Sequence, residues 1–120
     1  MNDNQAADAE LEIAVAQTDA DHATVTLTGR LDVLEASRLR EQLAGANLAG
    51  ARHLLIDLAA VTFVDSAGLA VLARARRDRL AGDGTLTVVR PTSDDAMRVF
   101  RLTQFDQILT MIDRPESSSA

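Results

Sequence analysis

The residues most able to carry chemistry lie in one short motif, Asp65-Ser66-Ala67-Gly68-Leu69. Asp and Ser ahead of an apolar-periodic segment predict the N-terminus of a helix. If Asp65 is the N-cap, Ser66 falls at the first helical position and its hydroxyl is not needed for capping. The hydroxyl would stand beside unpaired backbone N–H groups and the positive end of the helix dipole. A phosphoryl group suits this position, because it adds about −1.5 to −2 charges where negative charge is favoured.

The same motif also has a purely structural interpretation, in which Asp65 and Ser66 only begin a helix. Val64 and Leu69 would then form a hydrophobic staple around the cap. Ala67 and Gly68 are small, which would let a partner molecule approach closely. The residues alone therefore permit a modification site at Ser66 without establishing one.

Few other residues offer catalytic or metal chemistry. His22, in a predicted turn, and His53, at a predicted strand start, have no neighbouring set of ligands. The segment Gly82-Asp83-Gly84 is a turn without the surroundings of a nucleotide-binding loop. Cysteine is absent, which excludes disulfides and thiolate chemistry and fits a reducing cytoplasm. We therefore predict a non-enzymatic protein with no catalytic residue, metal or cofactor.

Length and composition restrict the class of protein further. The 120 residues have the size of one domain, and 47% hydrophobic with 25% charged residues is typical of a globular chain. A net charge of −6 and the absence of Trp and Tyr argue against nucleic-acid binding, which relies on neutralised phosphates and stacked bases. No apolar run approaches the roughly 20 residues that span a bilayer, and no signal-peptide pattern is present. We predict a cytoplasmic protein that neither inserts into membranes nor binds nucleic acid.

All 12 basic residues are arginines, and four of them lie close together: Arg74, Arg76, Arg77 and Arg79. Near the end of a helix they would form a solvated face that complements the negative end of the dipole, by about 0.3–1 kcal/mol per charge. The alternative is contact with an acidic surface of a partner protein. Both interpretations stay open from the sequence.

Hydrophobic periodicity places the motif in a series of strands and helices. Strands are predicted near residues 11–16, 25–29, 53–58, 85–89 and 107–112, the first two joined as a hairpin by a turn at 18–21. Helices are predicted from the cap Asp32 to about 45–50, from Ser66 to about Leu80, and from the cap at 92–95 through Arg101. The order β-β-α-β-α-β-α-β predicts an α/β fold, a mixed sheet of about five strands with helices packed on it. Residues 1–10 and 114–120 are predicted to be flexible tails around one domain at 11–113.

Three segments together resemble the STAS domain of anti-sigma factor antagonists. They are Gly29-Arg30-Leu31-Asp32, Ile56-Asp57-Leu58 and Phe63-Val64-Asp65-Ser66-Ala67-Gly68-Leu69. The similarity extends over about residues 11–113. It implies the STAS fold and a docking face on which the 29–32 loop lies beside the serine. The partner-binding residues that it implies are Gly29, Arg30, Leu31, Asp32, Asp65, Ser66, Ala67, Gly68 and Leu69.

The resemblance also implies a regulatory cycle. In the family, the unphosphorylated protein binds an anti-sigma factor that is also a serine kinase with a GHKL-type ATP site, and this frees the sigma factor. The kinase then phosphorylates the serine after the aspartate, here Ser66, and the phosphorylated protein no longer holds the kinase. A PP2C-type phosphatase resets the cycle. The protein is expected to be a monomer or weak dimer.

Three features depart from the family's pattern. Ala67 stands where many members have a second serine, which leaves Ser66 as the phosphoacceptor of the motif. Arg30 stands at a position that is often acidic, which bears on partner choice. Only seven residues follow Asp113, so the closing helix of the family is expected to be short or absent.

Two other functions stay open at this level. A STAS subunit of a lipid-transporting ABC system, or a scaffold of the stressosome type, would use the same face without a kinase cycle. A small-ligand-binding or enzymatic domain would need pocket chemistry, of which the sequence shows none.

Overall fold

The computed structural model describes residues 11–114. Its elements, in chain order, are β1 (Leu11–Gln17), β2 (His22–Leu31), α2 (Val33–Leu43), α3 (Ala46–Ala49), β3 (His53–Val64), α4 (Ser66–Ala81), β4 (Thr85–Val89), α5 (Asp94–Leu102), α6 (Phe105–Ile108) and β5 (Thr110–Ile112). The predicted flexible tails, residues 1–10 and 114–120, lie outside the described residues except for Arg114. The predicted outcome for a closing helix after Asp113 also falls on residues outside the described range. Among the described helices, none is long and apolar enough to cross a membrane.

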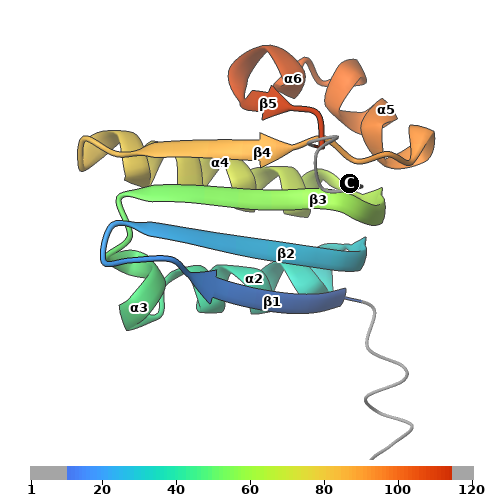
Figure 1. Ribbon diagram of the computed structural model, residues 1–120. Helices are drawn as coiled ribbons and strands as arrows, with labels where there is room; N and C mark the ends of the chain where they lie inside the picture. The colour runs from blue at the N-terminus through green and yellow to red at the C-terminus, as the bar shows by residue number, and fades with distance from the viewer. Residues whose placement is uncertain (1–10, 115–120) are drawn as a thin grey trace, which may run out of the picture.

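The strands form one mixed sheet in the order β1-β2-β3-β4-β5, and the strand order follows the chain (Figure 1). β1 pairs antiparallel with β2, as the hairpin prediction requires, and the remaining pairs are parallel. Helices α2 and α4 lie next to each other on one face of the sheet, and α5 packs against β3. The predicted α/β fold with a mixed five-stranded sheet is confirmed.

The core lies between the sheet and the helices α2 and α4. Alternate residues of β2 and β3 point into it, as the period of two requires. The largest fully buried side chains there include Leu27, Ile56 and Leu58 from the strands, and Leu39 and Leu72 from the helices. Burying each such side chain contributes about 1.5–3 kcal/mol, so this layer holds α2 and α4 in place on the sheet.

The middle strand differs from its prediction. β3 is one strand of 12 residues rather than a short run ending at Leu58. Its register with β2 shifts between the pairs Thr26–Asp57 and Thr28–Ala60, where the Asp57 side chain accepts a hydrogen bond from the Ala59 N–H at 2.9 Å. The shift changes which residues face the core, so the simple alternation of the sequence is interrupted there.

Two short helices were not predicted. Residues 46–49, in the 45–50 segment predicted to end the first long helix, form the separate helix α3. Part of the predicted last strand, Gln107 and Ile108, belongs to α6, and β5 is only three residues long. The left-handed residue Gln104 (φ 64°) separates α5 from α6, and the Leu109 N–H donates to the Phe105 carbonyl at 2.8 Å. The helical turn satisfies backbone groups that a longer edge strand would leave unpaired.

Candidate functional site

The two sequence motifs meet at the carboxyl ends of the parallel strands β2 and β3. Leu31 and Val64, the last residues of these strands, are register partners. The Asp65 N–H donates to the Leu31 carbonyl at 3.3 Å, and the Thr62 hydroxyl donates to the Gly29 carbonyl at 3.3 Å. Because neighbouring parallel strands end at the same edge of a sheet, residues 29–32 and 65–69 lie next to each other.

Both helices that begin at this edge are capped by aspartate. The Asp32 carboxylate accepts from the Glu35 N–H, and the Asp65 carboxylate accepts from the Gly68 N–H, each at 3.1 Å. The structure confirms that Asp65 is the cap and that Ser66 is the first residue of α4. Ser66 is exposed, and within the described residues its hydroxyl makes no hydrogen bond. The hydroxyl is therefore accessible at the positive end of the helix.

The remaining motif residues form two groups, one exposed at the surface and one buried beneath it. Arg30 is exposed, with its guanidinium carbon 4.1 Å from the centre of the Phe63 ring. Partly exposed neighbours complete the surface: Gly29, Asp32, Asp65 and Ala67. Leu31, Gly68 and Leu69 are buried, so they position this surface from below. We call the exposed and partly exposed set, together with Ser66, the Ser66 face.

Gly68 is small for a different reason than the sequence suggested. A Cβ at Gly68 would lie 2.8 Å from Leu31 Cγ and 3.0 Å from the Leu31 carbonyl oxygen. Its size permits the start of α4 to approach the end of β2, and a partner cannot reach this buried residue. The small size of Gly68 therefore lets the two segments of the Ser66 face, residues 29–32 and residues 65–67, lie against each other.

Gly68→Ala is expected to destabilise the protein by about 1–3 kcal/mol, because the added methyl group overpacks against Leu31. Urea denaturation measures the effect, and a cycle with Leu31→Ala tests its cause. Leu31→Ala removes the side-chain part of the clash and leaves only the carbonyl oxygen of residue 31 close to the methyl group, so the double variant should lose less stability than the sum of the two single variants. If the losses of unfolding free energy in the two single variants simply added up in the double variant, the contact between Gly68 and Leu31 would not be their cause.

The arginine cluster of α4 does not act as one unit. Arg79 is only 8% exposed, and its Nη2 donates to the Leu48 carbonyl at 2.7 Å, which attaches α3 to α4. Burial lowers the pKa of Arg79. Arg79 is therefore not part of a solvated face, although it also lines a groove between α2 and α4. Arg77 Nε lies 3.8 Å from Asp78 Oδ1. Arg74 lines the same groove between α2 and α4.

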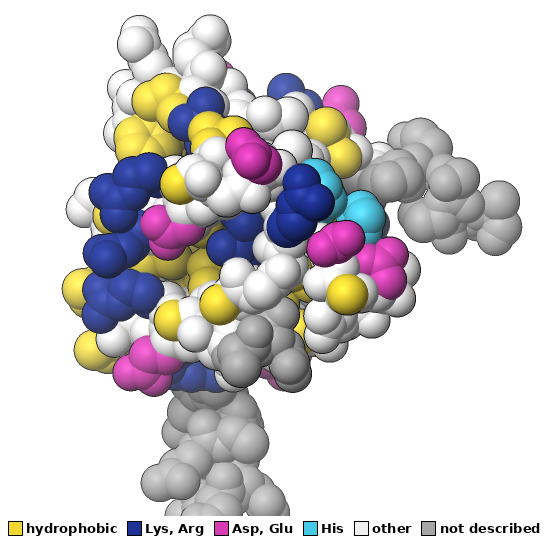
Figure 2. Space-filling model, turned by 90° about the vertical axis from the view of Figure 1, so that its left-hand side faces the viewer, with side chains coloured by type: hydrophobic (Ala, Val, Ile, Leu, Met, Phe, Trp, Pro, Cys, Tyr) yellow, Lys and Arg dark blue, Asp and Glu magenta, His cyan; other side chains and the backbone are white. Residues whose placement is uncertain are grey.

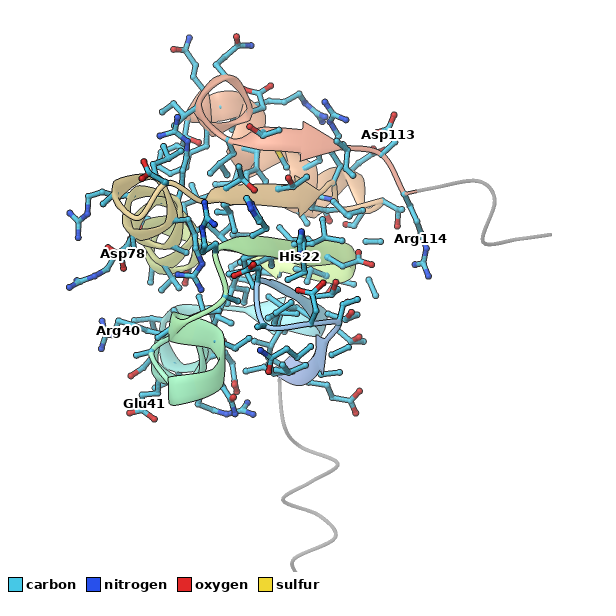
Figure 3. The ribbon with its side chains drawn as sticks, turned by 60° about the vertical axis from the view of Figure 1, so that its left-hand side comes forward. His22, Arg40, Glu41, Asp78, Asp113 and Arg114 are labelled. Atoms are coloured by element: carbon cyan, nitrogen blue, oxygen red, sulfur yellow. The ribbon has the colours of Figure 1, made fainter. Side chains whose placement is uncertain are left out.

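The sequence did not predict that His22 and His53 form a pair at the opposite end of the sheet. The rings of His22 and His53 stack with their centres 4.9 Å apart, since the two residues are register partners in β2 and β3. His22 Nδ1 lies 2.9 Å from Asp19 Oδ1, and this hydrogen bond lowers the pKa of Asp19. His53 Nδ1 lies 2.9 Å from Thr85 Oγ1. Figure 3 labels His22 at the turn that follows β1.

The histidine pair lacks the parts of a metal centre. In the described part of the chain, no group of three or more His, Cys, Asp or Glu residues could hold a metal ion. The pair lies where the parallel strands begin, whereas Ser66 follows the end of β3. The Ser66 face is therefore the stronger candidate for the functional site.

Comparison with known proteins agrees with the fold and the motifs. The family model described as "Mlab, STAS domain" matches residues 14–112. An anti-sigma-B factor antagonist of Listeria monocytogenes is 28% identical over 99 residues, which cover 82% of this chain and 86% of that protein.

Solved structures show the same architecture. The anti-sigma factor antagonist SpoIIAA in its unphosphorylated form matches with a TM-score of 0.75 at 17% identity, over 90% of this chain and 92% of that one. An anti-sigma factor antagonist from Mycobacterium paratuberculosis matches with a TM-score of 0.75 at 24% identity, over 89% of each chain. At these identities the likeness concerns the fold. Because the family model spans most of the sequence and the structure has the matching fold, this chain belongs to the STAS domain family, as its motifs predict.

Proposed function

We propose that this protein is an anti-sigma factor antagonist whose binding is switched off by phosphorylation of Ser66. The unphosphorylated form binds a GHKL-type anti-sigma factor that is also a serine kinase, and a sigma factor is released. A PP2C-type phosphatase removes the phosphoryl group. The chain itself catalyses no step, acts in the cytoplasm, and works as a monomer or weak dimer.

The observation that carries the proposal is the position of Ser66. Its hydroxyl is exposed at the first residue of α4, and the capping bond is supplied by Asp65 instead. A kinase can therefore modify Ser66 without breaking a contact of the fold. The name of the Listeria relative supports the antagonist function.

The energetics suit a switch that does not need refolding. A hundredfold loss of affinity corresponds to about 2.7 kcal/mol. A phosphoryl group in a partly desolvated interface can supply this by desolvation and by repulsion from acidic groups of the partner. Asp32 and Asp65 already place two carboxylates on the Ser66 face, so phosphorylation adds to the negative charge that a partner has to accommodate.

Incubation with the cognate anti-sigma kinase and ATP is expected to add one phosphoryl group to the wild-type protein and none to Ser66→Ala. Intact-mass spectrometry measures the addition. Thr110→Ala is the control, because Thr110 is also an exposed hydroxyl residue, on β5, outside the Ser66 face, and its loss should leave phosphorylation intact. Phosphorylation of Ser66→Ala to the wild-type extent would refute the site.

A second candidate is a STAS subunit of a lipid-transporting ABC system or a stressosome-type scaffold. Both caps are in place without any modification, so the Ser66 face is equally available to a permanent partner. Such a subunit would use this face in a permanent complex. Co-purification with a transporter ATPase, and no phosphate uptake from GHKL kinases, would favour this candidate over the switch.

A further inference from the structure

The outer surface of helices α2 and α4 carries a groove that the proposed switch does not use. Two adjoining hollows, of about 360 and 520 Å³, share Arg40, Val71 and Arg74, so they form one continuous groove between the helices. At one end it begins beside Ala67, next to Ser66, and at the other it reaches Asp78. At about 1.5 Å per helical residue, it follows α4 for about 17 Å, or roughly three turns.

The lining of the groove combines an apolar floor with charged walls. Ala36, Ala67, Ala70 and Val71 give the half nearest Ser66 a surface of small side chains. Val33, which is 64% exposed at the first residue of α2, adds an apolar side chain to this lining. Small side chains would let the backbone of another element come close. The half nearest Ser66 can therefore bury apolar side chains of a partner.

The charges of the groove are unbalanced near Ser66. Arg40 projects from α2 and Arg74 from α4, both are exposed, and within the described residues neither makes an ion pair. The carboxylates that line the groove, Glu41 and Asp78, belong to the half farther from Ser66. Figure 3 shows Arg40 and Asp78 on the same side of the molecule, and Figure 2, which views the end opposite Ser66, shows dark-blue and magenta side chains together beside a hollow with an apolar floor.

We propose that this groove docks an acidic amphipathic helix of a protein partner. A helix of about three turns matches the length of the groove, which is longer than a small ligand requires. Its apolar face would cover the alanine floor, and its carboxylates would pair with Arg40 and Arg74, whose guanidinium groups suit bidentate contacts. The groove is continuous with the Ser66 face at Ala67, so one partner can cover both. The assignment of this helix to the anti-sigma factor rests on the proposed function. The groove and its charges do not depend on that function.

The proposal is tested by nuclear magnetic resonance on the full, ¹⁵N-labelled protein. The probe is a synthetic helical peptide of about 14 residues, of which about 11, or three turns, span the groove. It is made of Glu and Leu at helical spacing, and the comparison peptide has Lys in place of Glu. The Glu peptide is expected to shift amide signals along α2 and α4, with an affinity that falls as salt is added. The Lys peptide is expected to leave these signals in place.

A charge-reversed variant identifies the residues responsible. Arg40→Glu with Arg74→Glu is expected to weaken binding of the Glu peptide by at least about tenfold. The matched control is Arg98→Glu with Arg101→Glu, which makes the same charge change at exposed residues of α5, outside the groove. Its affinity should stay within about twofold of the wild type. All four positions are exposed, so both variants are expected to fold, which circular dichroism checks.

Three results would overturn the groove proposal: no binding of the Glu peptide, shifts confined to other elements, or equal losses in the two double variants. The peptide assay contains no kinase. If the peptide does not bind, the proposal that Ser66 is phosphorylated is unaffected. If the kinase does not phosphorylate Ser66, the groove proposal is likewise unaffected.

Discussion

Ser66→Asp is expected to weaken binding of the anti-sigma kinase by roughly a hundredfold, about 2.7 kcal/mol, while the fold becomes no less stable. The carboxylate places a permanent negative charge on the Ser66 face, as a phosphoryl group would. At the first residue of α4 the same charge interacts favourably with the helix dipole, by about 0.3–1 kcal/mol. Affinity and stability should therefore move in opposite directions, which isothermal titration calorimetry and urea denaturation measure separately.

Ser66→Asn is the control that separates charge from size, because the amide has nearly the shape of the carboxylate without its charge. It should bind the kinase much more tightly than Ser66→Asp, and Ser66→Ala should bind like the wild type. If Asn and Asp weakened binding equally, bulk at Ser66 would explain the loss and the electrostatic account would fail. Wild-type affinity in Ser66→Asp would argue against a switch at this residue.

Gly84→Ala is expected to cost at least about 3 kcal/mol, the upper end of the usual overpacking range. A Cβ at Gly84 would lie 1.9 Å from the Arg52 carbonyl oxygen and 2.7 Å from its carbonyl carbon. Both are backbone atoms at the point where β3 and β4 begin to pair, and the Thr85 N–H donates to the same oxygen at 2.9 Å. The strands must separate to admit the methyl group. The melting temperature should fall by more than about 12 °C, at roughly 4–8 °C per kcal/mol for a small domain.

Gly82→Ala is the matched control two residues earlier. A Cβ there would meet the carbonyl oxygens of Arg79 and Asp78 at 3.9 Å, which is ordinary van der Waals contact, and the φ of Gly82 is −100°. The change in stability should stay within about 1 kcal/mol of zero, since any loss is offset by a less flexible unfolded chain. Equal effects at Gly82 and Gly84 would show that the close approach to Arg52 is not responsible.

The sequence predicted best where a signal is local. Asp32 and Asp65 make the caps of α2 and α4, as expected. The 92–95 pattern predicted where α5 begins, but the cap is Ser93 and not Thr92, the first residue of that pattern. Each cap is a bond between residues three apart in the chain, so a short motif contains both partners. The same holds for the hairpin of β1 and β2, whose turn residues stand together in the sequence.

Contacts between distant segments could not be predicted in this way. The turn after α4 was expected from its glycines, yet the left-handed residue is Asp83 (φ 61°), and Gly84 is required by a backbone 32 positions away. The pairing of His22 with His53 depends on the register of two strands, and the arginine interpretations missed that Arg79 lies beneath α3. These features become visible only when the packing is known, because no local pattern distinguishes a buried arginine from an exposed one.

The contact of Gly68 with Leu31 also limits how this sequence can diverge over generations. The two residues stand 37 positions apart, but the space at one is defined by the size of the other. In a lineage that acquires alanine at 68, a shorter side chain at 31 relieves the side-chain part of the clash, while the carbonyl oxygen of residue 31 stays close whatever its side chain. The 29–32 and 65–69 segments are therefore expected to change together, whereas Arg30 takes no part in this contact.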